Sequence, residues 1–274
     1  MRKVNIITDS TVKDYPAGAE MVDDTLSRYL DAEIIPTRFF DTINSDTTYI
    51  ISNATMMKAH IKEQLINNHE YYIFEHDYKF HHTRQPHRFK DNIIPKDQLI
   101  NIDYYKNAKC VFLQTKDHLE CFNNNEIQGN FISLGTSLWS EEELSLLNHY
   151  RELYFQKDPR IVVIANQTAD KGRDIALQWC YEWGIKPHTI ATVSQKDFYN
   201  ELGKYSSLVY FPRVKESFCR LVIEAKAMNL NVITKAYYGV TRENWYNDLN
   251  GEKLIAFLRT STINNIQTIK NIIL

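Results

Sequence analysis

Short apolar runs alternate with stretches of helical periodicity along the whole chain, and this alternation restricts the fold more than any other feature. The clearest run, at 160–165, holds consecutive aliphatic residues, as a strand buried on both faces requires. Similar runs recur at 4–7, 71–74, 110–113 and 231–234, with helical patterns between them. Strands that alternate with helices form parallel sheets with helices on both faces. We therefore expect an α/β fold with doubly wound parallel sheets.

The chain has 274 residues, which is enough for two domains of ordinary size. An acidic segment with helical periodicity, at 140–159, separates the two series of strands. We place the boundary after residue 156, which gives an N-terminal domain at 1–156 and a C-terminal domain at 157–274. The last residues, at 263–274, have a helical pattern, and this helix is a candidate to cross back onto the first domain.

The composition excludes several classes of protein. With 43% hydrophobic and 24% charged residues the chain is an ordinary globular one, and its net charge of -2 gives no overall electrostatic case for a dedicated nucleic-acid binder. The four cysteines form no paired motif, which suits a reducing compartment. No stretch approaches the ~20 apolar residues of a membrane span, and the first residues lack a signal-peptide pattern. We expect a cytoplasmic protein.

A strand, loop, helix and strand at 207–234 carry the most informative motif. Glu216 stands in the loop, and Glu224 follows eight residues later, inside a helix that begins near Phe218. Eight helical residues rise about 12 Å, so the two carboxylates can address opposite ends of an extended ligand. The helix N-terminus between them offers N–H groups and a favourable dipole to a phosphate. A nucleotide sugar needs this order: an acid for sugar hydroxyls, a diphosphate site and an acid for the ribose.

This segment resembles the retaining family 4 glycosyltransferases, whose signature E-x7-E is commonly E-G-F-G-x-x-x-x-E-A-M-A-x-G-x-P-V-I. The chain departs from that pattern at Ser217 and Cys219, where the family usually has glycines. The resemblance implies the GT-B fold, two Rossmann-like domains with an interdomain cleft. The positions that the chain shares with the signature are Glu216, Phe218, Glu224, Ala225, Ala227, Met228, Val232 and Ile233.

The resemblance also implies roles for residues of this segment. Glu216 would contact hydroxyls of the donor sugar, and Glu224 would bind the ribose of the nucleotide. The donor-binding residues whose backbone would cradle the sugar and the diphosphate are Phe218, Cys219, Arg220 and Leu221. The alternative is an ordinary amphipathic helix with two solvated acids.

A second segment, at 165–172, is similar to the family's G-R-L-x-x-E-K-G motif. Lys171 aligns with the lysine that neutralises the donor diphosphate. Asn166, also assigned to donor binding, stands where the family has an arginine. Arg220 and Arg213 are candidates to replace that missing cation. The alternative is a plain turn between a strand and a helix.

Two features of the first half are similar to family features. The segment at 17–20 contains Gly18 and resembles the glycine-containing loop that these enzymes place over the cleft, which implies donor binding. His76 follows the strand at 71–74, where the family positions a histidine that contacts the donor sugar, and ligands bind at the carboxyl ends of such strands. The resemblance thus implies a catalytic group of Glu216, His76 and Lys171. A solvated loop histidine and a plain helix start remain the alternatives.

The run at 79–90 is basic and interleaved with aromatic residues. It is either a solvated loop or a surface for an anionic acceptor, with Lys79, Arg84 and Arg88 as the acceptor-binding residues. The abundance of Asn, Ile, Tyr and Lys suggests an AT-rich genome such as that of a phage. The acceptor is then a glycan or a modified, hydroxymethylated base in phage DNA, and the location is the host cytoplasm.

We therefore expect a glycosyltransferase that moves a sugar from a UDP- or GDP-sugar to an acceptor hydroxyl with retention. No D-x-D motif is present, so we expect neither a metal ion nor another cofactor. Two alternatives remain open: a non-catalytic module that binds a nucleotide or sugar, and a GT-B nucleotide-sugar epimerase. The departures from the family motif are the reason for the first alternative.

Overall fold

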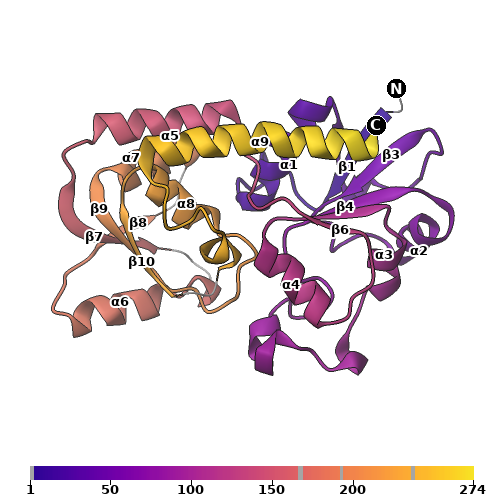
Figure 1. Ribbon diagram of the computed structural model, residues 1–274, viewed down its shortest axis with the longest axis horizontal. Coiled ribbons are helices and arrows are strands. Elements are labelled where there is room, and N and C mark those ends of the chain that lie inside the picture. Colours follow the sequence, from indigo (N-terminus) through magenta and orange to yellow (C-terminus); the bar gives the residue numbers. More distant parts are fainter. Residues whose placement is uncertain (1–2, 166–168, 192–193, 236–237) are drawn as a thin grey trace. The chain divides into compact units, whose positions relative to one another are not determined.

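The computed structural model describes residues 3–165, 169–191, 194–235 and 238–274 and divides the chain into two α/β units (Figure 1). Unit 1 comprises Met1–Leu138 and Ser261–Leu274, and unit 2 comprises Trp139–Thr260. The division therefore falls earlier than the expected boundary after residue 156. The reason is that α5 (Glu141–Leu153) packs against helices of unit 2.

Unit 1 contains a six-stranded parallel sheet with the strand order β2-β1-β3-β4-β5-β6. The order changes direction at β1, which makes the carboxyl ends of β1 and β3 a topological switch point. The strands are β1 (Lys3–Thr8), β2 (Glu33–Pro36), β3 (Thr47–Ile51), β4 (Tyr71–Glu75), β5 (Cys110–Leu113) and β6 (Phe131–Ser133). The helices are α1 (Gly18–Leu30), η1 (Thr37–Phe39), α2 (Ala59–Asn68), η2 (Pro86–Arg88), η3 (Lys90–Asn92), η4 (Lys96–Gln98), α3 (Ile102–Asn107) and α4 (Lys116–Asn124).

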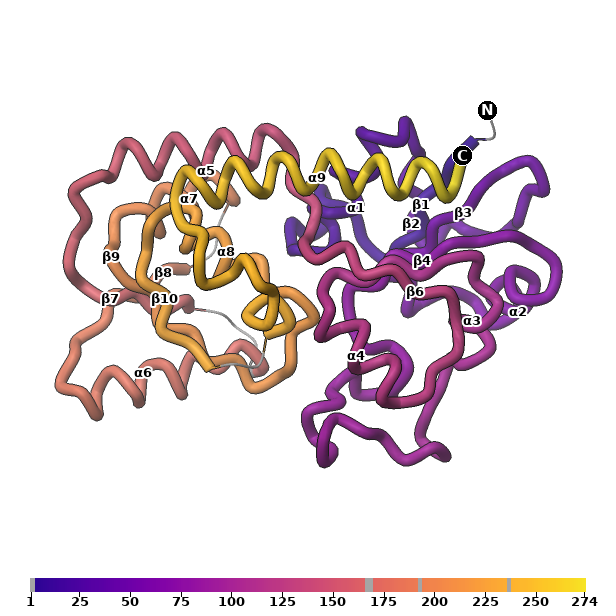
Figure 2. The backbone as a smooth tube through the Cα atoms, in the orientation of Figure 1, coloured from indigo at the N-terminus to yellow at the C-terminus, as the bar shows by residue number. Residues whose placement is uncertain are grey.

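Alternate side chains of these strands enter two cores, because each face of the sheet is covered by helices. Ile7 and Ile73 belong to the core that contains residues of α2, α3 and α4. Ile6 and Phe74 belong to the other core, with residues of α1 and of the last helix, α9 (Gly251–Ile273). Ile269 of α9 is fully buried there, and Figure 2 shows the yellow end of the chain beside the indigo β1. The end of the last helix thus belongs to unit 1.

Unit 2 contains a four-stranded parallel sheet with the order β10-β9-β7-β8. Val162 and Leu208 enter the larger core, with residues of α5, α7, α8 and the first half of α9. Val163 and Val209 face the opposite way, toward α6. The strands are β7 (Asp158–Ala165), β8 (His188–Ala191), β9 (Tyr205–Tyr210) and β10 (Asn231–Thr234). The helices are η5 (Ala169–Lys171), α6 (Arg173–Glu182), α7 (Gln195–Gly203), α8 (Arg220–Ala227) and η6 (Gly239–Arg242).

The parallel sheets confirm the expected α/β class, and each unit has the Rossmann-like alternation of strand and helix. Within the described ranges, no helix combines the length and the apolar character needed to cross a membrane.

Candidate functional site

Glu216 lies in the loop that connects β9 to α8, beyond the carboxyl end of β9. A parallel bridge to Tyr238 fixes its backbone, and its side chain accepts two hydrogen bonds on the same oxygen. The hydroxyl of Tyr210, the last residue of β9, donates to Oε1 at 2.8 Å. The Nζ of Lys171, at the end of η5, donates to Oε1 at 2.9 Å. The structure therefore brings together the two predicted catalytic residues of unit 2, although they are 45 positions apart in sequence.

The Lys171–Glu216 pair holds two opposite charges at the edge of the sheet. Burial alone would raise the pKa of Glu216, but the Lys171 ammonium and hydrogen bonds from Lys171, Tyr210 and Cys219 hold it below its ordinary value. The side chain of Lys171 is 41% exposed, whereas that of Glu216 is 17% exposed. An ionised carboxylate therefore lies beneath a cation that solvent can reach.

Cys219 has an unusual backbone at the start of α8. Its φ of 81° and ψ of 79° place this N-cap residue in the left-handed region, which favours glycine. The family resemblance put a glycine at this position, so the chain keeps the turn but not the residue. The buried thiol makes a hydrogen bond to Glu216, and burial together with the Glu216 charge raises the pKa of Cys219 well above its ordinary value.

Arg220 lies inside unit 2, in contact with two carboxylates and an indole ring. Its guanidinium contacts Glu143 Oε1, and its Nε is 3.7 Å from Glu224 Oε1. Its guanidinium carbon lies 3.7 Å from the centroid of the Trp139 ring. The side chains of Arg220 and Glu224 are each 9% exposed. In this arrangement the guanidinium of Arg220 lies against the buried carboxyl groups of Glu143 and Glu224.

Glu224 is buried at the centre of the same network. Burial is the main cause that raises the pKa of Glu224 to about 7. The positive charge of Arg220 lowers this pKa, whereas the negative charge of Glu143 raises it further. Sequence reasoning missed Glu143 and Trp139. The available signal was the capping box of α5, in which Ser140 and Glu143 exchange backbone and side-chain hydrogen bonds at 2.8 and 3.1 Å.

Other predicted donor-binding residues of this region have varied surroundings. Phe218 is buried, and Leu221 is half-buried against the larger core of unit 2. Arg213, the second candidate for the missing cation, contacts the carboxylate of Asp174 at the start of α6. Asn166 lies outside the described residues.

His76 belongs to a separate polar cluster in unit 1. It directly follows β4, and its Nε2 is 2.7 Å from Ser52 Oγ and 3.4 Å from Asp23 Oδ1. Ser52 directly follows β3 and donates to Asp23 Oδ1 at 2.5 Å, while Asp23 belongs to α1. Gly18, the predicted donor-binding glycine, is the first residue of α1. This cluster is therefore formed by residues at the carboxyl ends of two adjacent strands, β3 and β4, together with a residue of helix α1.

Sequence reasoning named His76 but missed Asp23 and Ser52. Asp23 Oδ2 is buried and makes no hydrogen bond to any residue that the structure describes. Glu20 interacts electrostatically with Asp23 and His76, and burial raises the pKa of Glu20 above its ordinary value. The position of Ser52 immediately after a strand was the signal that could have found it, because ligands bind at that edge of parallel sheets.

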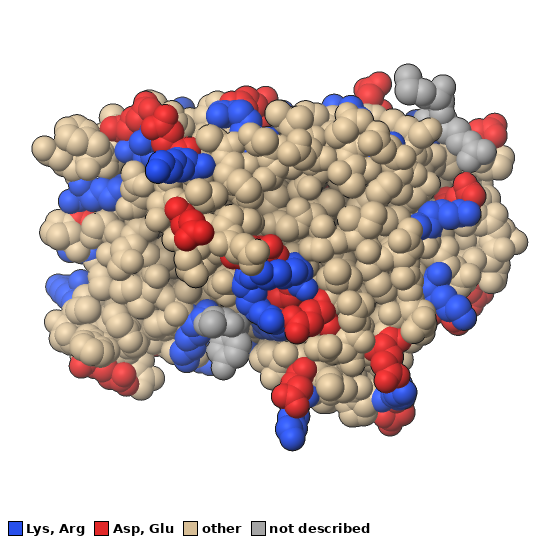
Figure 3. Space-filling model, in the orientation of Figure 1, with Lys and Arg blue, Asp and Glu red and all other residues tan. Residues whose placement is uncertain are grey.

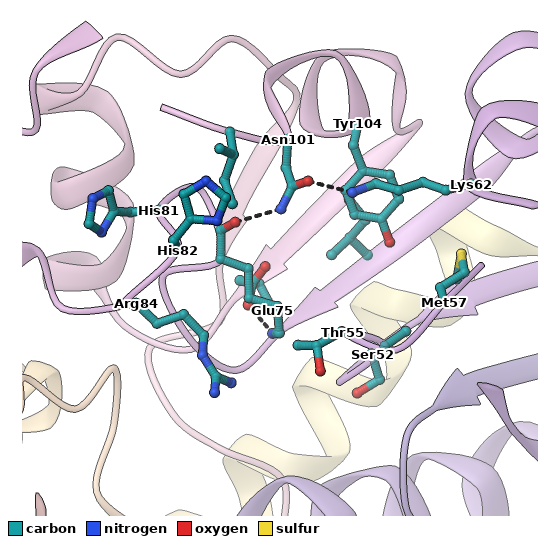
Figure 4. A pocket seen from close by; sticks show the side chains of 14 residues that line it. Ser52, Thr55, Met57, Lys62, Glu75, His81, His82, Arg84, Asn101 and Tyr104 are labelled. Atoms are coloured by element: carbon teal, nitrogen blue, oxygen red, sulfur yellow. Dashed lines mark hydrogen bonds and ion pairs between the residues drawn. The ribbon is translucent and has the colours of Figure 1, made fainter. Parts of the chain in front are cut away.

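A cavity of about 350 Å³ opens beside this cluster in unit 1, with Ser52 in its lining (Figure 4). Lys79 and Arg84 line the cavity, whereas Arg88 is exposed on η2 and is not part of the lining. The ammonium of Lys79 contacts the buried Glu75. Arg84 Nη1 is 3.2 Å from Asp77 Oδ2. Two of the three predicted acceptor-binding residues therefore share one pocket.

Comparison with known proteins shows the fold. No protein-family model and no curated protein matches the chain. HepE of Anabaena, solved with UDP and glucose, has 11% identity and a TM-score of 0.59, over 98% of this chain and 100% of HepE. The trehalose-6-phosphate synthase OtsA has 7% identity and a TM-score of 0.61, over 98% of each chain.

A third neighbour extends the same likeness. The sucrose-phosphate synthase of Thermosynechococcus elongatus has 12% identity and a TM-score of 0.57, over 100% of this chain and 95% of the synthase. These neighbours are glycosyltransferases with the GT-B fold, and at such identities the likeness shows the fold alone. The chain thus has the GT-B fold, with two Rossmann-like domains.

Proposed function

We propose that the protein is a glycosyltransferase that transfers a sugar from a UDP- or GDP-sugar to an acceptor hydroxyl. The Lys171–Glu216 pair at the edge of the unit 2 sheet is the observation that carries this proposal. A reachable cation suits the donor diphosphate, and an ionised carboxylate suits the sugar hydroxyls. Neighbours with this fold support UDP as the nucleotide, because HepE was solved with UDP and with UDP-glucose.

In the proposed reaction, the bond between the anomeric carbon and the diphosphate oxygen breaks, and the acceptor oxygen bonds to that carbon with retention. The leaving diphosphate takes the acceptor proton. Lys171 stabilises the charge that develops on the diphosphate, while Glu216 and His76 hold the sugar. We assign no metal ion to the reaction. Glu224 keeps its proposed ribose role, for which its carboxylate must exchange Arg220 for ribose hydroxyls.

The proposed acceptor is a glycan or a hydroxymethylated base in phage DNA, with the host cytoplasm as the location. Two observations favour the glycan. Lys79 and Arg84 are both paired with carboxylates, which weakens their attraction for a phosphate backbone. Acidic and basic side chains are also interspersed on the face shown in Figure 3, where no broad field of one sign is visible.

Release of UDP from UDP-sugars, measured with a panel of sugar acceptors, tests this function. Glu216→Gln should lower turnover about 100-fold, as the loss of one stabilising polar group in an active site does. The matched control is Glu201→Gln, which removes a carboxylate of unit 2 that pairs only locally with Lys204. A protein that binds UDP without releasing it from any donor is the binding module, and one that alters the donor sugar without acceptor is the epimerase.

A further inference from the structure

The pocket in unit 1 has the size of a small-molecule site. Its volume of about 350 Å³ lies at the lower end of the roughly 300–1,000 Å³ of ligand pockets, which suits a ligand of monosaccharide size. Ser52 lines it, and the same hydroxyl lies 2.7 Å from His76 Nε2. The pocket and the His76 cluster therefore share a residue.

Lys62 is a further cation in the lining of this pocket. Its half-buried ammonium contacts Asn101 Oδ1 and lies 4.7 Å from the centroid of the Tyr104 ring. Asn101 is held in this orientation because its Nδ2 donates to Lys79 O at 2.6 Å. Figure 4 shows the side chain of Asn101 pointing toward Lys62. Within the described ranges, no carboxylate forms an ion pair with Lys62. Burial lowers the pKa of Lys62, because the loss of hydration disfavours the charged ammonium.

The other cations of the pocket are already balanced. Lys79 pairs with Glu75, and Arg84 pairs with Asp77. Lys62 therefore gives the pocket an uncompensated positive charge. The ring of Tyr104 and the side chain of Met57 provide apolar surface, and the hydroxyl of Ser52 provides a polar partner. A small polyhydroxylated molecule that carries an anionic group matches this cation, this apolar surface and this hydroxyl group.

We propose that this pocket binds a small phosphorylated sugar, with its phosphate at Lys62, and that this sugar is the acceptor. The second part rests on the proposed glycosyltransferase function. A small pocket with one uncompensated cation suits a single phosphate monoester, whereas a duplex needs a row of cations along its backbone. The observation therefore favours a phosphorylated sugar over a hydroxymethylated base in DNA as the acceptor.

Calorimetric titration with glucose 6-phosphate, glucose and inorganic phosphate tests the proposal, with UDP as a separate probe of unit 2. Glucose 6-phosphate should bind more tightly than glucose. Lys62→Gln should weaken that binding at least about 10-fold, as the loss of a charge-assisted hydrogen bond does. Lys62→Arg should keep most of it. Lys106→Gln is the matched control, because it removes an exposed charge of unit 1 outside the pocket.

Equal binding of glucose 6-phosphate to wild type and Lys62→Gln would overturn the proposal, as would equal binding of glucose and glucose 6-phosphate. Lys62-dependent binding of a DNA duplex in place of the sugar phosphate would overturn it as well. UDP affinity must stay unchanged in every variant, which shows that the protein is folded. Failure of both UDP and GDP to bind the wild type contradicts the proposed function, whereas Lys62-dependent sugar-phosphate binding still supports the pocket.

Discussion

Two residues of unit 2 have unusual local properties: one has a strained backbone and the other has a shifted pKa. Cys219 adopts a glycine-like backbone although it has a side chain, and Glu224 is buried beside an arginine that also contacts Glu143. Both lie within the segment that resembles the family motif. Each can be tested by a substitution whose outcome depends on that local feature alone.

At Cys219, the glycine variant should be more stable than the alanine variant. Both variants lose the thiol, but only glycine relieves the left-handed backbone, which costs about 1–2 kcal/mol for a residue with a side chain. Glycine is ordinarily the less stable of the two by roughly 0.5–1 kcal/mol. Urea unfolding of Cys219→Gly and Cys219→Ala measures the order.

Cys180 is the matched control, because this buried cysteine lies inside helix α6. There the alanine variant should be the more stable, by the helix propensity difference of about 1 kcal/mol. The same order at both positions would show that the backbone of Cys219 is unstrained.

The buried carboxyl of Glu224 predicts a specific pH dependence of stability. Its pKa of about 7 in the folded protein lies above the ordinary value of 4.5, so folding favours the protonated form. That contribution is complete below the ordinary pKa and is lost as the pH rises through the folded pKa. Between about pH 5 and pH 8, the wild type should therefore lose roughly 2 kcal/mol of unfolding free energy relative to Glu224→Gln.

Urea unfolding of the two proteins at several pH values measures this difference, because contributions of the other titrating groups are common to both. Parallel curves would contradict the prediction. They would mean that Arg220 holds Glu224 ionised in the folded protein throughout this range.

At the scale of elements, the junction of η5 and α6 depends on one glycine. Gly172 has a φ of +62°, and a Cβ at this position would lie 1.9 Å from Phe211 O. At Gly172 the backbone passes close to Phe211, which follows the end of β9. Lys171 is the residue immediately before this close contact. Substitution here must therefore move backbone and not merely a flexible side chain.

Gly172→Ala should lower the free energy of unfolding by more than 2 kcal/mol, since backbone strain adds to a steric overlap. Gly184→Ala is the matched control, because Gly184 has a φ of +67° but nothing within 4 Å of an added Cβ. It should lose only the backbone contribution of about 1–2 kcal/mol. Equal losses in urea unfolding would show that the approach to Phe211 is not tight.

Elements with strong apolar patterns were predictable from the sequence, and weakly patterned ones were not. β7 and β4 each contribute apolar side chains to both faces of their own sheet, so their apolar runs indicated strands. β2 was not predicted, because it is a short, largely half-buried edge strand. The polar helix α4 was not predicted either. Its sequence mixes charged and amide residues, and only its tertiary contacts bury one side.

Candidate site residues could be predicted, but their partners could not. Lys171 and Glu216 were each recognised from the local sequence, and the structure shows that they form an ion pair. The contact between Arg220 and Glu143 joins residues 77 positions apart, and the contact between His76 and Asp23 joins residues 53 positions apart. Such pairs depend on the order of strands and helices, which periodicity does not reveal.

At the scale of the whole molecule, each unit contributes its own polar site. Unit 2 carries the Lys171–Glu216 pair, and unit 1 carries the His76 cluster and the pocket of Lys62. The helix α9 begins among residues of unit 2 and ends in a core of unit 1. The proposed division of labour assigns the donor nucleotide to unit 2 and the acceptor to unit 1.

Calorimetric binding of UDP, GDP and ADP to wild type and Lys171→Gln tests the central proposal most directly. We expect one of these nucleotides, UDP by the likeness of the fold, to bind the wild type. Lys171→Gln should bind it at least about 10-fold more weakly, because it loses a charge-assisted contact with the diphosphate. Lys196→Gln, a change at an exposed lysine of α7, should leave the affinity unchanged. Binding of none of the three, or equal affinity in Lys171→Gln, would contradict the assignment of a nucleotide-sugar donor to this site.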